Sequence, residues 1–333
     1  MGTIAAAPRR RLQTGRRIVG GILLALIPVV FGVLVFAVLR PLTLIWMAAE
    51  TRLFFAGIHS EYTRISCADL HNVRVHYYVG GSGNPVVLVH GLGGRADDWA
   101  GLMPRISRRH RVYAPDLPGY GRSDWPRDAT YSISEQAAAV EAFMDNRHLN
   151  RVDLGGWSMG GWVAMKVALD QPQRIRRLMI FDSAGIRFIV NWDPSLFEPD
   201  TPEKLRKLND LLMPTPPPRV PGFIARHIFQ YVGRHGWVVR RNMDSMLTGK
   251  DLLDGRLGEL KMPMLIVWGK QDHLIPWTVG EEIHQDVPQS ELEIFDGCGH
   301  LAPGQCAGRI GPVVEGFLDE PSPIPGISAE IGR

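Results

Sequence analysis

The sequence predicts an α/β fold, a doubly wound and mostly parallel sheet that carries a helical insertion. Two observations support this prediction. Short β-branched segments alternate with helical segments from about residue 73 onward, which is typical of a parallel sheet covered by helices on both faces. About seventy residues without a strand then interrupt the alternation, a length that exceeds a simple loop and predicts a separate helical unit.

Composition and charge restrict the possible classes of protein. The chain has 333 residues, of which 45% are hydrophobic and 21% charged, as in an ordinary globular protein with one large or two small domains. The net charge is +3, and the chain beyond residue 17 is slightly acidic. No basic stripe interleaved with aromatic residues appears, so we expect no nucleic-acid partner. Five arginines make the first segment basic: Arg9, Arg10, Arg11, Arg16 and Arg17.

The basic segment at 1–17 precedes an uncharged apolar run at 18–39, IVGGILLALIPVVFGVLVFAVL. A helix of this length spans about 33 Å and crosses a hydrocarbon core of about 30 Å, so the run predicts a transmembrane anchor followed by a linker at 40–65. Cleavable signal peptides usually have an apolar region of about 7–15 residues, and the nearest small-residue pair, Ala48-Ala49, lies beyond Arg40-Pro41. A cleaved signal is therefore the second interpretation, and a buried soluble helix is the third.

The charges around this run predict its orientation. Five arginines precede it, whereas Arg40 and Arg52 alone follow closely. Because positive charge is retained on the cytoplasmic side, we expect a single-pass membrane protein with a cytoplasmic N-terminus. The rest of the chain then lies outside the cytoplasm, in the periplasm if the source is bacterial.

The predicted strands are short and apolar, and most lack alternation, as expected for strands covered on both faces. They are Val73–Val79, Val86–Val89, Val112–Ala114, Val152–Leu154, Leu178–Phe181, Leu265–Val267 and Leu292–Phe295.

Helices are predicted between these strands. Ser132 and Glu135 form the pattern of a capping box, which predicts a helix from there to about Asn146. A second helix is predicted over Gly160–Gln171, where Pro172 stops it.

The long interval without strands predicts a helical cap at 185–258, with helical patterns around Phe223–Val232 and Trp237–Leu247. The core domain is then divided into 66–184 and 259–320, and a tail follows at 321–333.

A candidate nucleophile lies in the motif GWSMGG at 156–161. The motif follows a predicted strand and precedes a predicted helix, and in that context G-x-S-x-G forms a sharp turn that raises the Ser158 hydroxyl above the sheet edge. The pattern alone is weak, because glycine and serine are common residues. The strand–turn–helix context makes it specific.

Two further motifs supply the groups that a serine nucleophile requires. GKQD places Asp272 after one predicted strand, and GCGH places His300 after the next. A histidine removes the serine proton and later protonates the leaving group, while a buried carboxylate orients the imidazole. Asp182, which ends the strand Leu178–Phe181, is the alternative for the acid. The remaining histidines show no metal-ligand spacing, so no metal is predicted.

The developing oxyanion requires backbone donors, and HGLGG at 90–94 is rich in glycine where backbone must approach a substrate. We expect the N–H groups of Leu92 and Met159 to form this oxyanion hole. Trp99 and Trp157 are candidates for the substrate pocket, although large aromatic residues are more often core.

Three other groups of residues are assigned structural roles. We expect His90 to pack and form hydrogen bonds beneath the glycine-rich loop. Asp116 and Arg122 are interpreted as a pair that fixes a loop. Cys298 and Cys306 would pair in an oxidising compartment, but two buried thiols are the expectation.

Together, HGLGG, DLPGYGRS at 116–123, GWSMGG, GKQDHLIP and GCGH resemble the α/β-hydrolase superfamily over residues 73–318. The chain is most similar to membrane-associated bacterial lipases and esterases and to monoacylglycerol-lipase-like members. This resemblance implies an eight-stranded sheet and hydrolysis of a carboxylic ester or acylglycerol without a cofactor. Gln305-Cys306 departs from the pattern, because many relatives have a glutamate after the histidine motif.

The leading functional hypothesis is a serine esterase or lipase that forms an acyl-enzyme on a lipid-like ester. The same three residues also suit carbon–carbon bond hydrolysis or cofactor-free perhydrolysis. The serine at the elbow argues against the relatives that use aspartate there, the haloalkane dehalogenases and epoxide hydrolases. A non-catalytic binding protein on this fold is the remote third hypothesis, since all three catalytic residues are present.

Overall fold

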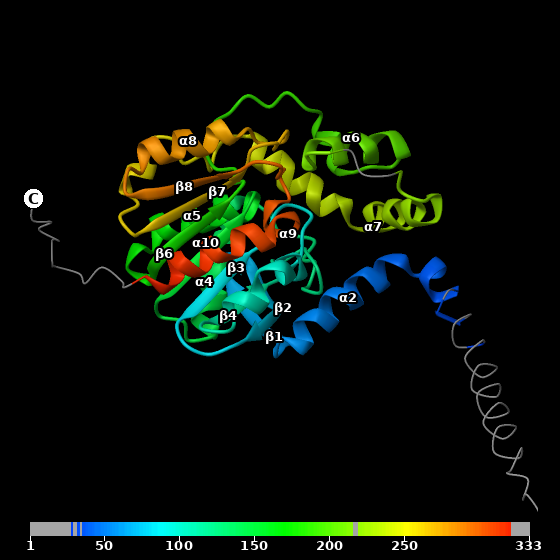
Figure 1. Ribbon diagram of the computed structural model, residues 1–333, viewed down its shortest axis with the longest axis horizontal. Helices are drawn as coiled ribbons and strands as arrows, with labels where there is room; N and C mark the ends of the chain where they lie inside the picture. The colour runs from blue at the N-terminus through cyan, green and yellow to red at the C-terminus, as the bar shows by residue number, and fades with distance from the viewer. Residues whose placement is uncertain (1–27, 29–31, 34, 216–218, 321–333) are drawn as a thin grey trace, which may run out of the picture.

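The computed structural model describes residues 28, 32–33, 35–215 and 219–320 (Figure 1). Its centre is an eight-stranded sheet in the order β1-β2-β4-β3-β5-β6-β7-β8. Strand β2 pairs antiparallel with both β1 and β4, and the remaining pairs are parallel. The strands are β1 (Ile58–Cys67), β2 (Leu70–Gly80), β3 (Pro85–Val89), β4 (Arg111–Pro115), β5 (Val152–Trp157), β6 (Ile175–Phe181), β7 (Met264–Gly269) and β8 (Ser290–Phe295).

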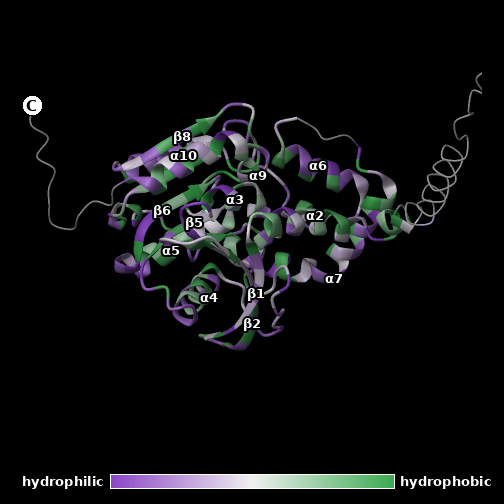
Figure 2. Ribbon diagram, turned by 60° about the horizontal axis from the view of Figure 1, so that its bottom comes forward, coloured by the Kyte–Doolittle hydropathy of each residue, from purple (hydrophilic) through white to green (hydrophobic). Residues whose placement is uncertain are grey.

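Helices cover both faces of this sheet and divide the core into two apolar clusters. One cluster joins Val140, Val163 and Ile283 from α4, α5 and α8, and the other joins Met103 and Val314 from α3 and α10. Figure 2 shows that the strands between these layers are mainly hydrophobic. The helices are α2 (Pro41–Phe55), α3 (Met103–Ile106), α4 (Ile133–Asn146), α5 (Met159–Asp170), α6 (Pro202–Leu212), α7 (Gly222–Leu247), α8 (Trp277–Asp286), α9 (Ala302–Gln305) and α10 (Ala307–Asp319), with short 3₁₀ turns η1 (Ala96–Gly101), η2 (Pro172–Arg174), η3 (Pro194–Phe197) and η4 (Leu257–Glu259).

The prediction of a doubly wound, mostly parallel eight-stranded sheet is confirmed. All seven predicted strands form, each extended by one to three residues at its ends. Helix α4 begins after Ser132, whose hydroxyl accepts a hydrogen bond from the Glu135 N–H as a capping box requires. The Glu135 carboxylate instead accepts from the N–H of Tyr131, one residue before the cap. Helix α5 ends two residues before Pro172.

The insertion between β6 and β7 is helical, but its two helical patterns belong to one helix. Helix α7 runs for 26 residues from Gly222 to Leu247, because no proline interrupts it and Gly233 and Gly236 are tolerated within it. Helix α6, capped by the Thr201 hydroxyl, precedes it. Both helices project beyond the sheet on one side of the molecule (Figure 1).

The predicted linker at 40–65 is wrong, because this segment forms helix α2 and most of strand β1. Pro41 is the first residue of α2, a position where a missing N–H costs nothing. Helix α2 lies between the cap and the sheet: the Trp46 ring meets the Tyr231 ring of α7, and the Arg95 guanidinium lies 4.3 Å above the same indole. Glu50 forms an ion pair with Arg122 at 2.6 Å. These contacts hold α2 as part of the folded domain.

The predicted basic segment at 1–17, most of the predicted anchor at 18–39 and the tail at 321–333 lie outside the described residues. Within the described part of the chain, no helix is both long and apolar enough to cross a bilayer.

Candidate active site

Ser158 occupies the tight turn between β5 and α5. Its φ of 55° is a left-handed conformation that non-glycine residues rarely adopt, and it aims the hydroxyl above the sheet edge. The turn requires its glycines: a β-carbon on Gly156 would overlap the Gly160 carbonyl, and one on Gly160 would overlap the Val89 carbonyl. The strain at Ser158 is therefore supported by close backbone packing on both sides.

The three residues from separate motifs meet at this turn. The Nε2 atom of His300 lies 2.9 Å from Ser158 Oγ, and its Nδ1 atom lies 2.7 Å from Asp272 Oδ2. The other oxygen of Asp272 accepts the N–H groups of Leu274 and Ile275 at 2.8 and 2.9 Å. Because the carboxylate accepts a hydrogen bond from Nδ1–H, Nε2 is left as the acceptor for the serine hydroxyl.

The structure joins His300 to Asp272 and not to the alternative acid, Asp182. Asp182 is fully buried, and one of its oxygens accepts the Gly269 N–H at 2.7 Å. Burial, together with the charge of nearby Asp272, raises the pKa of Asp182 well above its ordinary value. Through the Gly269 N–H, Asp182 links the end of β6 to β7 beside Asp272.

The expected oxyanion donors lie on either side of Ser158. Met159 is the first residue of α5, and the Ser158 side chain does not cap that helix, so its first N–H groups face the site. Leu92 follows β3, in a loop so close that a β-carbon on Gly91 would come within 3.1 Å of Ser158 Cβ. This arrangement is suited to stabilising negative charge on a substrate oxygen.

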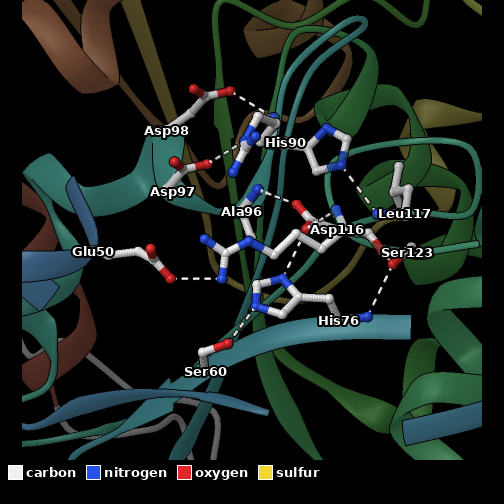
Figure 3. Close-up of polar contacts among 12 residues, drawn as sticks. Glu50, Ser60, His76, His90, Ala96, Asp97, Asp98, Asp116, Leu117 and Ser123 are labelled. Carbon is white, nitrogen blue, oxygen red and sulfur yellow. Dashed lines mark hydrogen bonds and ion pairs between the residues drawn. The ribbon is translucent and has the colours of Figure 1, made fainter. Parts of the chain in front are cut away.

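Buried polar contacts fix the glycine-rich loop (Figure 3). His90 Nδ1 donates to the Gly91 carbonyl at 2.8 Å, and Nε2 accepts the Leu117 N–H at 3.0 Å. This pattern requires a neutral imidazole, consistent with burial lowering the pKa of His90. His90 thus packs and forms hydrogen bonds beneath the loop, the arrangement anticipated from the sequence.

Asp116 connects the end of β4 to the same loop. Its Oδ1 atom accepts the Ala96 N–H at 2.6 Å, and its Oδ2 atom accepts the Arg122 N–H at 2.8 Å. Burial opposes its ionisation, but the hydrogen bond and charge of His76 outweigh burial and lower the Asp116 pKa. Asp116 therefore fixes two loops, as predicted, but the Arg122 guanidinium pairs with Glu50 and not with Asp116.

A second Ser–His–Asp arrangement surrounds Asp116 (Figure 3). His76 Nδ1 lies 2.7 Å from Asp116 Oδ2, and His76 Nε2 lies 2.8 Å from the Ser60 hydroxyl. Ser60 lies on β1, paired with Tyr78 of β2, and lines neither of the cavities at Ser158. We interpret this arrangement as structural, because Ser60 lies exposed on the edge strand β1, away from both cavities at Ser158.

Two cavities meet at Ser158 and Leu92. The Trp162 cavity, of about 270 Å³, is lined mainly by apolar side chains from α5, the segment after β6, the cap and the segment after β7, including Trp162, Ile186, Phe188, Trp192, Phe197, Met243, Met246, Leu252, Leu274 and Ile275. The His300 cavity, of about 300 Å³, opens on the other side of the nucleophile and includes Asp98, Tyr120, Trp125, Trp157, Ile228, Tyr231, Val232, His235, Val239, His300 and Leu301. Helix α7 contributes to both cavities.

The two tryptophans predicted to line the substrate pocket lie in different parts of the structure. Trp157 lines the His300 cavity and donates its indole N–H to the His300 carbonyl at 2.7 Å. Trp99 is 1% exposed and packs against Phe181 in the core, so it reaches neither cavity at Ser158.

Asp98 lines the His300 cavity, although the sequence did not predict it as a site residue. The acidic pair Asp97-Asp98, shortly after the glycine-rich loop, was the signal that could have indicated it.

Cys298 and Cys306 form a disulfide, so the expectation of two thiols is wrong. They are eight positions apart in the sequence, and the intervening turn brings the end of α9 back to the loop that carries His300. The bridge constrains this loop two residues before His300. Cys67 is the free cysteine among the described residues.

Loss of this disulfide is expected to lower both activity and stability. In a Cys298→Ser/Cys306→Ser variant the His300 loop gains freedom, and we expect kcat to fall roughly tenfold because a misplaced base disrupts proton transfer. The free energy of unfolding should fall by about 2 kcal/mol, the size expected for a short loop. Cys67→Ser is the matched control. Full kcat and an unchanged melting temperature in the double variant would contradict this role.

Within the described residues no cluster of three histidine, cysteine or acidic side chains suits a metal ion. A mostly parallel sheet whose strand ends carry a Ser–His–Asp chain of hydrogen bonds defines a hydrolase.

The chain belongs to the alpha/beta hydrolase family, whose model matches residues 86–309. Among relatives, it is 29% identical to a 2-hydroxy-6-oxononadienedioate/2-hydroxy-6-oxononatrienedioate hydrolase of Dechloromonas aromatica, with 82% of this chain and 99% of the relative covered. It is 30% identical to a 2-hydroxy-6-oxo-2,4-heptadienoate hydrolase of Pseudomonas putida over 73% of this chain and 91% of the relative. Among solved structures, a bacterial membrane phospholipase A is similar, with a TM-score of 0.72, 26% identity and coverage of 92% of this chain and 100% of the other.

Proposed function

We propose that this hydrolase cleaves carboxylic esters through an acyl-enzyme on Ser158. His300 removes the hydroxyl proton as Ser158 Oγ bonds to the ester carbonyl carbon, and the carbonyl oxygen becomes an oxyanion between the Leu92 and Met159 N–H groups. The acyl–oxygen bond then breaks, and His300 passes its proton to the departing alkoxide. A water molecule, activated by His300, releases the acid in the same way.

The position of His300 assigns the two cavities. A leaving alkoxide must lie within reach of the imidazole that protonates it. His300 lines the His300 cavity and is absent from the lining of the Trp162 cavity. We therefore assign the leaving group to the His300 cavity and the acyl chain to the Trp162 cavity.

The apolar lining of the Trp162 cavity is the observation that carries the ester proposal. Its walls are aliphatic, methionine and aromatic side chains, and Arg187 is the single charged residue among the described residues that line it. Such a surface suits a hydrocarbon chain, which gains free energy in proportion to the apolar area removed from water. The likeness to a membrane phospholipase A agrees with a lipid-like acyl group.

A series of p-nitrophenyl esters from C2 to C16 tests the proposal. We expect turnover with an optimum at intermediate or long chains, and Met246→Trp should lower kcat/KM for the longer esters roughly tenfold or more by filling the Trp162 cavity. Val232→Trp is the contrasting variant: Val232 lies on the same helix but lines the leaving-group cavity, so any loss should be the same for short and long esters. Failure of the wild-type chain to hydrolyse any ester of the series would contradict the proposal.

Carbon–carbon bond hydrolysis is the second candidate, and the named relatives favour it over ester hydrolysis. Two of those relatives act, by their names, on dienoates or dienedioates with a 6-oxo group. Arg187 at the Trp162 cavity is a cation that would pair with such a carboxylate. Assaying 2-hydroxy-6-oxohepta-2,4-dienoate beside the ester series decides between the two, because the preferred substrate has the higher kcat/KM.

We propose, finally, that the chain is attached to a membrane by residues 18–39, with its hydrolase domain outside the cytoplasm. Exposed apolar side chains extend from Phe36 into α2, where they include Leu44 and Ile45. Contact with lipid would cover these side chains. The disulfide agrees with an oxidising compartment. Alkaline carbonate extraction of membranes tests the attachment, and release of the intact chain would contradict it.

A further inference from the structure

The His300 cavity has an unusual combination of walls, namely a row of aromatic rings and one carboxylate. Tyr120 lies 6.5 Å from Trp125, Trp125 lies 4.4 Å from His235, and His235 lies 4.5 Å from Tyr231, measured between ring centroids. The rings come from the loop after β4 and from α7, so the folded cap is needed to assemble them. Aromatic faces carry partial negative charge and attract cations.

Asp98 provides the single formal charge among the described residues that line this cavity. One carboxylate oxygen accepts the Arg95 N–H at 2.8 Å, and no other hydrogen bond to it is found within the described part of the chain (Figure 3). The Arg95 guanidinium does not neutralise it, because that group is bound to Asp97 at 2.7 Å and lies over Trp46. The cavity is thus electronegative, and its carboxylate has acceptor capacity left for a ligand.

The histidines of the cavity do not oppose a cation. His235 Nδ1 lies 3.1 Å from the Tyr231 carbonyl and donates to it, which leaves Nε2 as an acceptor. Burial lowers the pKa of His235, so the ring is neutral at pH 7. His300 directs its Nε2 atom at the Ser158 hydroxyl, 2.9 Å away.

We propose that the His300 cavity recognises a leaving group with a cationic nitrogen, an amino alcohol, with Asp98 as counter-ion and the rings of Tyr120, Trp125, Tyr231 and His235 as its aromatic walls. This inference rests on the proposed ester hydrolysis, because it names the alcohol half of that substrate. It makes Asp98 a specificity-determining residue. A phosphate or carboxylate on the leaving group is disfavoured by the same charge.

The charge of Asp98 gives the proposal a pH dependence. Desolvation within the cavity is the main cause that raises the pKa of Asp98 to about 7, and the charges of Asp97 and Asp116 add to it. The Arg95 N–H and guanidinium oppose the rise, and Tyr231, His235 and His300 face the same space. Asp98 keeps solvent-exposed surface while it lines the cavity. Below pH 7 the carboxyl is protonated, so preference for a cation should increase as the pH rises from 6 to 8.

A matched pair of substrates tests the proposal. Octanoylcholine carries a quaternary nitrogen where 3,3-dimethylbutyl octanoate has a carbon atom, so the two esters differ in charge and not in shape. We expect wild-type kcat/KM to favour the choline ester about tenfold at pH 8, the size of a cation–π contact supported by a carboxylate. The preference should decrease toward pH 6. A wild-type ratio of one or less would overturn the proposal.

Asp98→Asn separates the charge from the fold. Asparagine keeps an oxygen for the Arg95 N–H, so the loop hydrogen bond survives while the charge is lost. The ratio should fall to about two or less and lose its pH dependence. Glu203→Gln removes one negative charge from α6 at a residue that does not line the cavity, and it should keep the wild-type ratio. An unchanged ratio in Asp98→Asn would overturn the role of Asp98.

A binding measurement distinguishes this inference from the proposed function. Choline and 3,3-dimethyl-1-butanol are titrated by calorimetry into the Ser158→Ala variant, which needs no turnover. Tighter binding of choline supports the cation site even if no ester is hydrolysed, in which case the ester proposal alone fails. Hydrolysis of the neutral ester without preferential choline binding supports the esterase and overturns the cation site.

Discussion

Replacing Ser158 with alanine is expected to reduce kcat by about 10⁴- to 10⁶-fold, because it removes the atom that forms the acyl-enzyme. The Ser158 hydroxyl lies 2.9 Å from His300 Nε2 and lines both cavities. A fluorophosphonate probe should label the wild-type chain and fail to label the variant. The melting temperature should change little, since the change removes a single oxygen atom.

Ser60→Ala is the informative control for this experiment. Ser60 also lies within hydrogen-bond distance of a histidine that contacts an aspartate, at 2.8 and 2.7 Å. A serine activated merely by such neighbours would be labelled as well. We expect Ser60→Ala to keep wild-type labelling and turnover. Residual labelling of Ser158→Ala that disappears when Ser60 is also replaced would show that the second arrangement is reactive.

Replacing Asp272 with asparagine is expected to reduce kcat by about 10⁴-fold at neutral pH. Asparagine is nearly the same shape, but its oxygen would remain with the Leu274 and Ile275 N–H groups. Its NH2 group would then face Nδ1, where it can neither accept the Nδ1–H hydrogen bond nor stabilise the imidazolium. The imidazole then presents a proton toward Ser158 instead of a lone pair. Kinetics at saturating substrate measure the effect, with KM expected to change far less than kcat.

Asp182→Asn is the matched control, because Asp182 was the alternative acid. One of its oxygens accepts the Gly269 N–H, a role that the asparagine oxygen can take over. We expect kcat within a fewfold of the wild type. A loss in Asp182→Asn as large as that in Asp272→Asn would show that the two carboxyls work as one unit and would contradict the assignment.

Local pattern accounts for the parts of the fold that were predicted. The seven predicted strands are apolar runs of the length that a sheet covered on both faces requires. Of the helices predicted between them, α4 begins at the Ser132 cap and α5 ends shortly before Pro172. Strand β1 was missed because IHSEYTRISC at 58–67 is largely exposed at the sheet edge, where burial does not impose an apolar pattern. Helix α2 was missed because its neighbours, Trp46 with Tyr231 and Arg95, are distant in sequence.

The sequence by itself determined the sheet, the helical nature of the insertion and the nucleophilic turn, because each depends on residues close together in the chain. The three motifs placed Ser158, Asp272 and His300 at the ends of parallel strands, which must meet at one edge. The tertiary structure alone decided which aspartate contacts His300 and that Cys298 and Cys306 pair. It also decided which cavity faces His300 and that Asp98 lines it. Contacts of this kind depend on how segments far apart in the chain come together in space. A local pattern of hydrophobicity or turn residues does not encode such distances.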